Sequence, residues 1–534
     1  MSALRVPVGE IRKPMGVLGE PMGVLRGPIG ALRVPMGALR GPMGALRGLW
    51  KSLFVACMTL LSASAIAGPM GADDARHLLN RTGFDAQPAQ IESFAGLSRS
   101  EAVERLLTGV RTSARTPAPA SALEYVSYRQ MRSLAEEDRK KLQRQLIDNA
   151  LDLKNWWVAE MISTPSPLTE RMTLFWHNHF TSSLQKVRSS ALMYRQNLLL
   201  REHALGNFGV LLHAVGKDPA MLVYLDTAIN RRGAPNENFA REVMELFTLG
   251  EGNYTEQDVS EAARAFTGWS LDPASGEFLW RPFAHDSGTK SVLGRSGEFS
   301  GVQVLDLLLA RPETAEFIVA KLWKEFVSPR VDVRETARIA RLFRQSGYEI
   351  KTALRALLAS DAFYAQSNRG ALIKSPVDLV IGTMRQFRVG FSDPLPITLL
   401  LRRLGQDLFS PPNVKGWPGG DAWINSSTLL ARRQFLERLF RVDENRMQAT
   451  RAVADMNPMR QPGEGREGRE RFMRAALDIH FSGSDWLRQF EGRGAQIGLQ
   501  RVLLALPPAA DRAEEVQGVD LIRRLTADPA YQLK

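Results

Sequence analysis

The stretch Leu174–Phe180 of this 534-residue chain reads LFWHNHF, and its periodicity decides how the surrounding segment folds. In a helix, the positions i, i+3, i+4, i+7 and i+8 form one buried face. They are occupied by Met172, Phe175, Trp176, His179 and Phe180. His179 then points toward the core, and His177 lies about 200° around the helix axis. Two such histidines cannot bind one metal ion. If the segment instead ends as a strand, the period of two places both imidazoles on one side and permits a shared metal.

Helical periodicity continues from Asp73 onward, and only one segment favours a strand. Glu277–Phe283 (EFLWRPF) alternates, HDSG can turn, and KSVLG can return, so we expect a small hairpin there. The sequence predicts a mainly α fold, a large multi-helix globular domain with one small β-hairpin insertion. The expected helices span residues 134–161, 188–202, 207–218, 238–249, 255–267, 302–309, 313–326, 333–346, 350–359, 376–387 and 427–440.

The first 42 residues consist mostly of a seven-residue unit such as PMGALRG, which repeats between Pro7 and Arg47. Each unit carries Pro and Gly, and Pro in every second turn removes a backbone donor and clashes with the preceding turn. A heptad coiled coil is therefore excluded. We interpret residues 1–42 as a translated repeat upstream of the true start, with initiation at Met43 or Met36; the alternative is a disordered basic arm.

Residues 43–67 have the three parts of a secretory signal peptide. Positive charges at Arg47 and Lys51 precede an apolar run over residues 53–61, and Ala-Ile-Ala ends at Ala67. We expect cleavage near Ala67 and export to the periplasm or the outside. Cys57, the single cysteine, lies in the leader, so the mature chain has no disulfide. The apolar run is too short to span a bilayer comfortably, and no later stretch predicts a membrane span.

The charge of the mature chain limits the kinds of partner that it can have, and its composition indicates its domains. The formal net charge is +12, but residues 1–51 hold eight Lys and Arg against two Glu, which leaves 61 basic and 55 acidic residues. This weak excess disfavours nucleic acid as a partner. Residues 68–456 are expected to form the helical domain, 457–470 a Gly/Pro/charged linker, and 471–534 a helical segment that packs on the main domain.

The segment NENFAREVMELFTLG, residues 236–250, carries the first candidate carboxylates. Asn238, Glu242 and Glu245 fall at i, i+4 and i+7 and share a face of the expected helix. Such a ridge can supply metal ligands or a general base. The alternative is a solvated face stabilised by ion pairs, because Arg241 lies four residues from both Glu237 and Glu245.

Two loops carry further candidates. His285 and Asp286 begin HDSGTKSVLG, and a His-Asp pair on a turn is a common ligand pair, although turn chemistry alone explains the aspartate. Lys290 could neutralise an anion there. In SPPNVKGWPGGDAWINSST, residues 410–428, Trp417 and Trp423 suit either stacking on sugar rings or a large helical core.

Seven phrases occur in a fixed order between His77 and the C-terminus: HLLNRTGF, LFWHNHFTSS, NENFAREVMELFTLG, YTEQDVSEAARAFTGW, FAHDSGTKSVLG, KLWKEFV and PPNVKGWPGGDAWINSSTLLARRQF. Together they resemble the domain-of-unknown-function 1800 family of exported bacterial proteins. The resemblance implies export and a helical fold and no established reaction. It also marks positions of interest without assigning roles: His177, Asn178, His179, Asn238, Glu242, Glu245, His285 and Asp286.

Two hypotheses for function follow. The first is an uncharacterised extracytoplasmic metal-dependent hydrolase, with Zn, Mn or Fe as the ion. The second is a non-catalytic protein that binds an extracellular or envelope polymer or another exported protein, with the same polar groups forming a buried hydrogen-bonded network. The metal hypothesis requires at least three of the named side chains within reach of one point. Its expected metal ligands are His177, His179, His285 and Asp286, and its expected catalytic carboxylates are Glu242 and Glu245.

Overall fold

The structure is a computed structural model that describes residues 68–441, 466–491, 495–509 and 516–534. The chain divides into two units, residues 1–66 and 67–534. The predicted repeat, the predicted signal peptide with Cys57 and most of the predicted linker lie outside the described residues. The linker ends earlier than expected, because a helix begins at Arg466.

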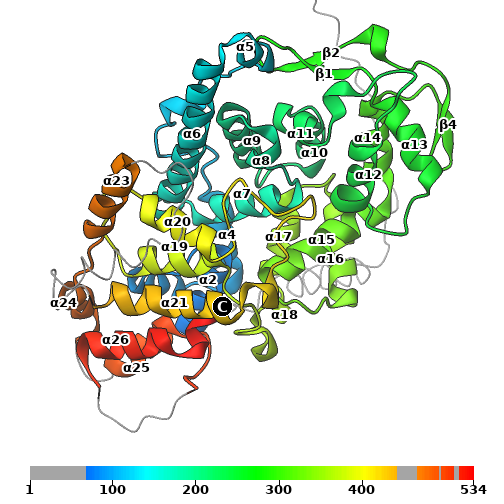
Figure 1. Ribbon diagram of the computed structural model, residues 1–534. Coiled ribbons are helices and arrows are strands. Elements are labelled where there is room, and N and C mark those ends of the chain that lie inside the picture. Colours follow the sequence, from blue (N-terminus) through cyan, green and yellow to red (C-terminus); the bar gives the residue numbers. More distant parts are fainter. Residues whose placement is uncertain (1–67, 442–465, 492–494, 510–515) are drawn as a thin grey trace, which may run out of the picture. The chain divides into compact units, whose positions relative to one another are not determined.

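Helices dominate the described residues, which confirms the mainly α fold (Figure 1). The first group is α2 (Gly71–Thr82), α3 (Pro88–Ala95), α4 (Arg99–Thr108), α5 (Tyr128–Ser133), α6 (Glu136–Ser163), α7 (Pro167–His179), α8 (Leu184–Val187), α9 (Ser190–Glu202), α10 (Phe208–Gly216), α11 (Pro219–Tyr224), α12 (Asn238–Glu242) and a π-helix (Val243–Thr248). The second group is α13 (Glu256–Ala265), α14 (Gly301–Ala310), α15 (Pro312–Phe326), α16 (Val333–Gln345), α17 (Ile350–Leu358), α18 (Asp361–Tyr364), α19 (Pro376–Gln386), α20 (Leu395–Arg403), α21 (Ser426–Leu439), α23 (Arg466–Leu477), α24 (Gly483–Leu487), α25 (Ala495–Leu503) and α26 (Gly518–Ala527).

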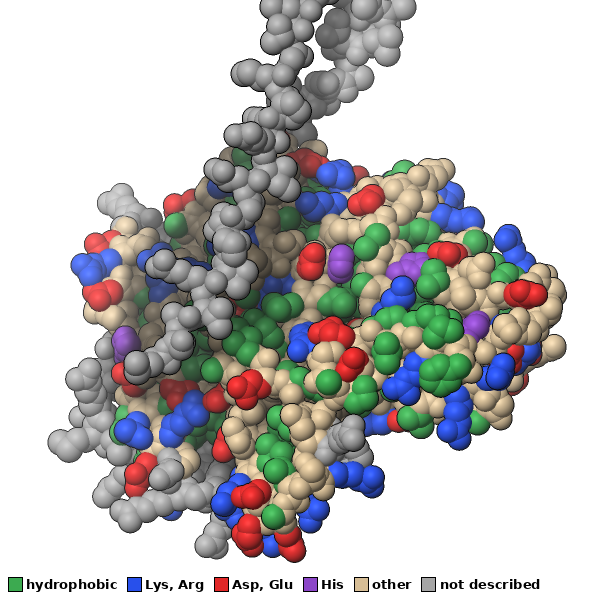
Figure 2. Space-filling model, turned by 90° about the horizontal axis from the view of Figure 1, so that it is seen from above, with side chains coloured by type: hydrophobic (Ala, Val, Ile, Leu, Met, Phe, Trp, Pro, Cys, Tyr) green, Lys and Arg blue, Asp and Glu red, His purple; other side chains and the backbone are tan. Residues whose placement is uncertain are grey.

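Short 3-10 turns connect these helices: η1 (Ala120–Ala122), η2 (Thr227–Ile229), η4 (Pro282–Ala284), η5 (Gln366–Asn368), η6 (Gly420–Trp423), η7 (Arg488–Phe490) and η8 (Pro529–Gln532). Within the described ranges, no helix combines the length and the apolar character that crossing a bilayer requires. Charged side chains of both signs are interspersed on the face shown in Figure 2.

The described strands form two hairpins where the sequence predicts one. β1 (Trp269–Leu271) pairs antiparallel with β2 (Phe278–Trp280), and β3 (Lys290–Val292) pairs with β4 (Arg295–Gly297). The expected pairing of residues 277–283 with KSVLG is therefore wrong. The reason is local turn chemistry: Leu293 and Gly294 have φ of 51° and 76°, as a two-residue hairpin turn requires, so β3 folds back on its own successor.

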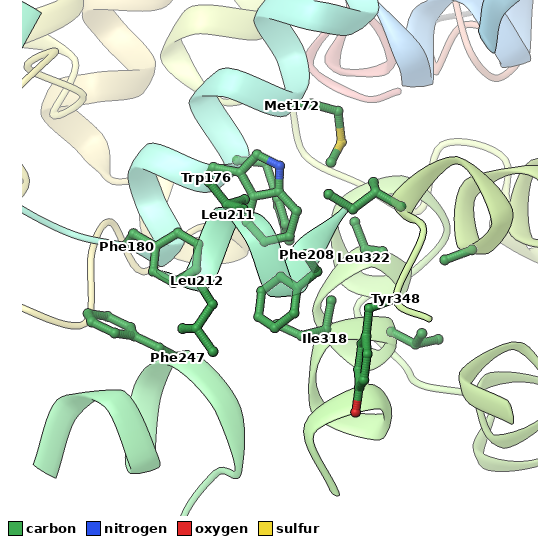
Figure 3. Close-up of a cluster of buried hydrophobic side chains, with 14 of the residues drawn as sticks. Met172, Trp176, Phe180, Phe208, Leu211, Leu212, Phe247, Ile318, Leu322 and Tyr348 are labelled. Atoms are coloured by element: carbon green, nitrogen blue, oxygen red, sulfur yellow. The ribbon is translucent and has the colours of Figure 1, made fainter. Parts of the chain in front are cut away.

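Helix α7 contains most of LFWHNHF and lies between two hydrophobic cores. It begins with Pro167 in its first turn and remains helical through His179, so the helical interpretation is confirmed and the strand alternative is excluded. One of its faces contributes Met172 and Trp176 to the larger core, where the side chains from several helices meet (Figure 3). The opposite face contributes Leu174 to the second core.

The second core also contains the two tryptophans of the 410–428 loop. Trp417 and Trp423 are only 4% and 7% exposed, so they pack in the interior and are not available as stacking platforms for sugars. The packing alternative for these residues is therefore the one that the structure supports. The loop itself is fastened over α7, which brings its polar residues toward α12 and the π-helix, as described below.

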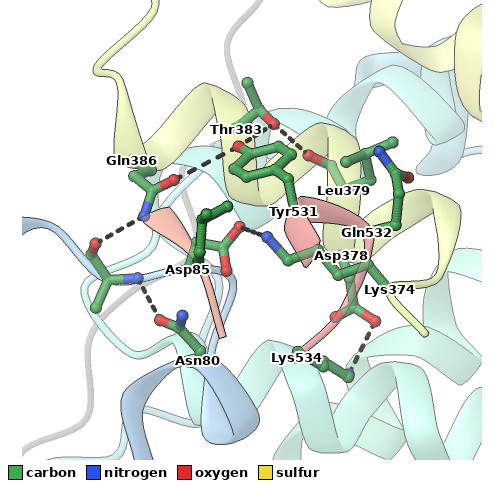
Figure 4. Close-up of polar contacts among 12 residues, drawn as sticks. Asn80, Asp85, Lys374, Asp378, Leu379, Thr383, Gln386, Tyr531, Gln532 and Lys534 are labelled. Carbon is green, nitrogen blue, oxygen red and sulfur yellow. Dashed lines mark hydrogen bonds and ion pairs between the residues drawn. The ribbon is translucent and has the colours of Figure 1, made fainter. Parts of the chain in front are cut away.

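A buried charge network joins α19 to the last residues of the chain (Figure 4). Asp378 accepts hydrogen bonds from Arg171 and, at 2.8 Å, from Lys534 Nζ, and these cations hold the pKa of Asp378 well below its usual range despite burial. Lys374 pairs with Asp85 at 2.7 Å. Because each charge has a buried partner, the network fixes the register of residues 529–534 against α19.

Candidate functional site

The carboxylates Glu242 and Glu245 lie where α12 changes into the π-helix. The π-helix ends with Leu249 N–H and Gly250 N–H both donating to the Met244 carbonyl, at 2.8 and 3.2 Å. Val243, Met244 and Phe247 are buried, whereas Leu246 and both glutamates are partly exposed. A π-turn inserts an extra residue into a helix, and such insertions often accompany functional sites.

These two glutamates form a mixed polar group with Tyr254 and Lys415, which we name the carboxylate cluster. Tyr254 donates from its hydroxyl to Glu245 Oε2 at 2.8 Å, and Lys415 Nζ lies 3.8 Å from Glu245 Oε1. Burial raises the pKa of Glu242, and the nearby charge of Glu245 raises it further. Burial and the hydrogen bond to Glu245 raise the pKa of Tyr254 to about 12, so its hydroxyl stays a donor.

The ion pairs predicted for this helix are present only in part. Arg241 pairs with Glu237 at 3.2 Å, as expected, and with Glu256 at 2.7 Å. In the described part of the chain, no ion pair joins Arg241 to Glu245, whose carboxylate accepts from Tyr254 instead. The π-turn changes the angular spacing after Glu242, so a spacing of four residues no longer brings those side chains together.

Asn238, the third residue of the predicted ridge, contacts a neighbouring polar group. Its side-chain amide donates to Asp226 Oδ2 at 3.3 Å, and Lys186 Nζ donates to the same oxygen at 2.7 Å. Lys186 also lies over the ring of Tyr224, 5.8 Å from its centroid. Burial and the charge of Glu242 raise the pKa of Tyr224, so the phenol lies within the field of the carboxylate cluster.

His179 and Lys321 together cap the end of the π-helix. His179 Nε2 lies 3.2 Å from the Phe247 carbonyl, and Lys321 Nζ donates to His179 Nδ1 and to the Leu246 carbonyl, each at 3.0 Å. Since the lysine donates to Nδ1, the other ring nitrogen carries the proton and donates to Phe247. The last carbonyls of a helix lack intrahelical donors, and these two side chains supply them. Both ring nitrogens of His179 are thereby occupied.

Burial determines the charge states of this cap. It lowers the pKa of His179 well below its ordinary value, and the adjacent Lys321 lowers it further, so the imidazole is neutral. Burial also lowers the pKa of Lys321 to about 8. A neutral imidazole and a cation beside helix carbonyls are the favourable arrangement at the negative end of a helix dipole.

His177 lies on the opposite face of α7 and is enclosed by aromatic rings. Its ring centroid is 5.5 Å from that of Trp157, 5.5 Å from that of Phe409 and 5.7 Å from that of Trp417. Burial lowers its pKa to about 3. Among the described residues, its Nε2 has no hydrogen-bond partner. The predicted separation of the two histidines is confirmed, since His177 packs on Trp157 of the second core and His179 on Phe247 of the larger core.

Asn178, between the histidines, fastens the 410–428 loop. Its Oδ1 accepts from the Trp417 N–H at 2.7 Å. Gly416 has φ of 82°, and a Cβ at this position would come within 2.2 Å of Asn178 Oδ1. Only glycine permits both this conformation and this approach. The preceding residue of the loop is Lys415, so this contact places its ammonium beside Glu245.

His285 and Asp286 are held within their own turn. His285 Nδ1 lies 2.9 Å from the Thr267 carbonyl, and its ring packs on Trp280. Asp286 pairs with Arg264 at 2.8 Å, which lowers the pKa of the carboxyl. Lys290, considered above as an anion partner, donates instead to the carbonyls of Asp286 and Gly288, at 2.6 and 2.8 Å.

The structure therefore brings Glu242 and Glu245 together and places the three candidate histidines in separate surroundings: His179 and His285 contact backbone carbonyls, whereas His177 packs among aromatic rings. In the described ranges, no group of three or more His, Cys, Asp or Glu side chains is placed to hold a metal ion. Tyr254, Lys321 and Lys415 are candidate functional residues that the sequence did not predict. Each lies inside one of the quoted phrases. The partners of Lys321 and Lys415 are distant in the sequence, and Tyr254 contacts Glu245, nine residues away, across the end of the π-helix, so no helical spacing marks any of the three.

Comparisons with known proteins agree with the resemblance found in the sequence. No curated protein and no solved structure matches the chain. Residues 77–533, which are most of the chain, match the family model DUF1800, described as a protein of unknown function. The chain belongs to the DUF1800 family.

Proposed function

We propose that the protein is exported and acts outside the cytoplasm as a non-catalytic protein that binds a hydroxyl-rich envelope polymer at the carboxylate cluster. The observation that carries this proposal is the partial exposure of Glu242 and Glu245 beside Tyr254 and Lys415, while His179 and His285 are hydrogen-bonded to backbone carbonyls. Export is supported by the leader-like sequence of residues 43–67.

The chemistry of the cluster suits hydroxyl groups. Carboxylate oxygens accept hydrogen bonds from sugar hydroxyls, and an ammonium group donates to their oxygens. The side chain of Lys415 is 64% exposed and Glu242 is partly exposed, so a donor and an acceptor both reach the surface. Asn238 and Lys186 extend the same polar surface through Asp226. A polymer binds such a surface through many weak contacts, repeated along its length.

The metal-dependent hydrolase has less support from the geometry. His179 uses both ring nitrogens to contact Phe247 and Lys321, and His285 contacts the Thr267 carbonyl. Recruiting either as a ligand would break a contact that holds a helix end or a turn. We expect protein beginning at Gly68 to bind the polymer equally well before and after treatment with EDTA, and elemental mass spectrometry checks its metal content.

The binding test uses insoluble peptidoglycan sacculi and an insoluble neutral glucan, pelleted with protein that begins at Gly68. The variant Glu242→Gln/Glu245→Gln keeps the size of both side chains and removes their charges. We expect its affinity for one of these polymers to fall at least about tenfold, which corresponds to about 1.4 kcal/mol. Glu316→Gln, an exposed glutamate on α15, is the matched control. Equal binding by the variant and the control, or no binding by the unaltered protein, would contradict the proposal.

A second candidate function is metal-independent hydrolysis of the same polymer. It is favoured by one observation: two adjacent carboxyl groups have different environments, with the pKa of Glu242 raised and Glu245 hydrogen-bonded to Tyr254. Such pairs can divide the roles of acid and base. Release of soluble saccharides by the unaltered protein, abolished in Glu242→Gln while binding remains, would establish this function in place of simple binding.

A further inference from the structure

We infer that a second surface, separate from the carboxylate cluster, docks on an anionic lipid bilayer. This surface, the arginine-flanked patch, consists of the apolar side chains of Ile229, Trp280 and Phe283 together with Arg231, Arg232 and Arg281. The inference goes beyond the proposed polymer binding and uses different residues.

The three apolar side chains of the patch are unusually open to solvent. Phe283 is 78% exposed, Ile229 71% and Trp280 40%. Single exposed apolar residues are common on protein surfaces, but several large ones in one place indicate an interaction site. Figure 2 looks at the molecule from the side on which Figure 1 places β1 and β2, and it shows hydrophobic side chains beside Lys and Arg side chains on that face.

Backbone hydrogen bonds bring the two segments of the patch together. Arg232 N–H donates to the Ala284 carbonyl at 2.7 Å, so the chain after η2 runs beside η4. Gly268 lies between them: its N–H donates to the Asn230 carbonyl at 3.1 Å, and its carbonyl accepts from Arg281 N–H at 2.9 Å. The turns that carry Ile229 and Phe283 are therefore neighbours in a connected framework.

This framework also fixes the aromatic side chain of β2. Gly268 has φ of 87°, and a Cβ there would lie 2.8 Å from the Arg281 carbonyl and 2.9 Å from the Trp280 ring. The Trp280 ring packs against His285, with 4.9 Å between ring centroids. A preorganised patch loses little conformational entropy when it docks, which favours binding.

The side chains that flank the patch are positively charged, and one of them, Arg281, also donates to the Leu271 carbonyl at 3.4 Å. Among the described residues, no ion pair is recorded for Arg231, Arg232 or Arg281, and the first two are exposed. The nearby carboxylates already have cationic partners: Asp226 pairs with Lys186, Glu237 with Arg241 and Asp286 with Arg264.

Charge and shape together indicate the occupant. Near an anionic membrane surface each Arg contributes roughly 1 kcal/mol, and aromatic side chains favour the interface between headgroups and acyl chains. Three exposed apolar side chains with arginines around them can insert into the headgroup region of the bilayer, while the guanidinium groups contact lipid phosphates. A purely apolar protein partner would leave these arginines without counter-charges, so the bilayer fits the patch better.

The test is sedimentation of the protein, beginning at Gly68, with phosphatidylcholine vesicles that either contain or lack phosphatidylglycerol. We expect binding only to the anionic vesicles, and less binding as salt concentration rises. Phe283→Ser/Ile229→Ser and Arg231→Gln/Arg232→Gln should each reduce the affinity at least tenfold. Val333→Ser, a change at a 76% exposed residue on α16, is the matched control and should leave binding unchanged.

A second measurement reports the orientation of the docked protein. Lipids with brominated acyl chains quench tryptophans that enter the interface, so they should quench the unaltered protein and quench Trp280→Phe less. Equal binding to neutral and anionic vesicles, unchanged binding by the patch variants, or equal quenching in Trp280→Phe would overturn the inference. The patch and the carboxylate cluster share no residue and are tested with different variants, so failure here leaves the polymer-binding test unaffected.

Discussion

At the scale of single residues, burial decides what a polar side chain does in this protein. Asp218 is almost completely buried and caps α11, accepting from Met221 N–H at 2.9 Å and from Gln196 Nε2 at 2.7 Å. Ser182 in turn donates to Gln196. Burial raises the pKa of Asp218 to about 7, since neither hydrogen-bond donor is charged. His177 shows the same effect with the opposite sign, because burial lowers the pKa of a base.

The raised pKa of Asp218 predicts that the free energy of unfolding depends on pH. The folded state binds a proton more tightly than the unfolded state, so this group stabilises the fold below about pH 4 and loses that contribution as the pH rises through about 7. Asp218→Asn preserves an acceptor for the cap and removes the titration. Relative to the unaltered protein, the variant should gain up to a few kcal/mol between pH 4 and pH 7, at about 1.4 kcal/mol per pKa unit. Urea unfolding of both proteins at each pH measures this, and a constant difference across that range would contradict it.

At the scale of elements, the π-helix depends on side chains that come from α7 and α15. Its final carbonyls are satisfied by His179 and Lys321, and the two side chains also contact each other. The loop that carries Lys415 depends in the same way on Asn178. Both contacts connect residues at the end of LFWHNHF to the carboxylate cluster. The LFWHNHF segment therefore positions the cluster without belonging to it.

Removing the cap should loosen the π-helix. Lys321→Met leaves the Leu246 carbonyl and His179 Nδ1 without a donor, at a cost of about 1–3 kcal/mol. Chemical denaturation measures the loss, and hydrogen exchange should show faster exchange in residues 243–250. Lys324→Met, an exposed lysine on the same helix, is the control. Protection of these amides equal to that of the control would show that the cap is dispensable.

The close approach at Gly416 gives a second test at this scale. Gly416→Ala must fit a Cβ against Asn178 at a positive φ, so we expect it to shift the loop, move Lys415 away from Glu245 and weaken polymer binding severalfold. Gly419→Ala is the control, because Gly419 also has a positive φ of 72° but has open space at its Cβ. If both variants lose binding equally, backbone strain alone is responsible and the contact with Asn178 is not.

At the scale of the whole molecule, buried ion pairs connect parts that are distant in the sequence. Arg171 on α7, Asp378 on α19 and Lys534 meet in one network, of which Figure 4 shows the contact between Asp378 and Lys534. Arg171 also pairs with Glu325 of α15 at 3.3 Å. Such a network costs much desolvation, so it stabilises the fold only while every charge keeps its partner.

Removing one charged partner of this network should therefore lower the free energy of unfolding more than removing both members of an ion pair. We expect Lys534→Met to destabilise the folded protein by about 3–5 kcal/mol, because it leaves Asp378 with one cation fewer in a buried site. Asp378→Asn/Lys534→Met should cost less than the sum of the two single changes. Thermal or urea unfolding of all four proteins forms the double-mutant cycle, and strict additivity would contradict the coupling.

The sequence predicts most of the longer helices, because local periodicity and caps mark them, but it does not identify α3, α4 or α20. The helical course of LFWHNHF and the opposite directions of its two histidines follow from the 3.6-residue repeat. The hairpins are less predictable, since β2 and β3 are only three residues long. The turn before β3 could have paired β3 with β2, but the turn after β3 pairs it with β4. The ridge of Asn238, Glu242 and Glu245 is predicted only approximately, because nothing local reveals the π-turn.

By itself, the sequence determined the family, the mainly α fold and the positions of the polar residues that are candidates for a functional site. Only the tertiary structure decided which of them serve the interior and which face solvent. His179 caps the π-helix because Lys321 and the Phe247 carbonyl contact it from other elements, whereas Glu242 and Glu245 stay partly exposed. The physical reason is that a polar side chain acquires its role from desolvation and from partners distant in the sequence, and neither is encoded in local spacing.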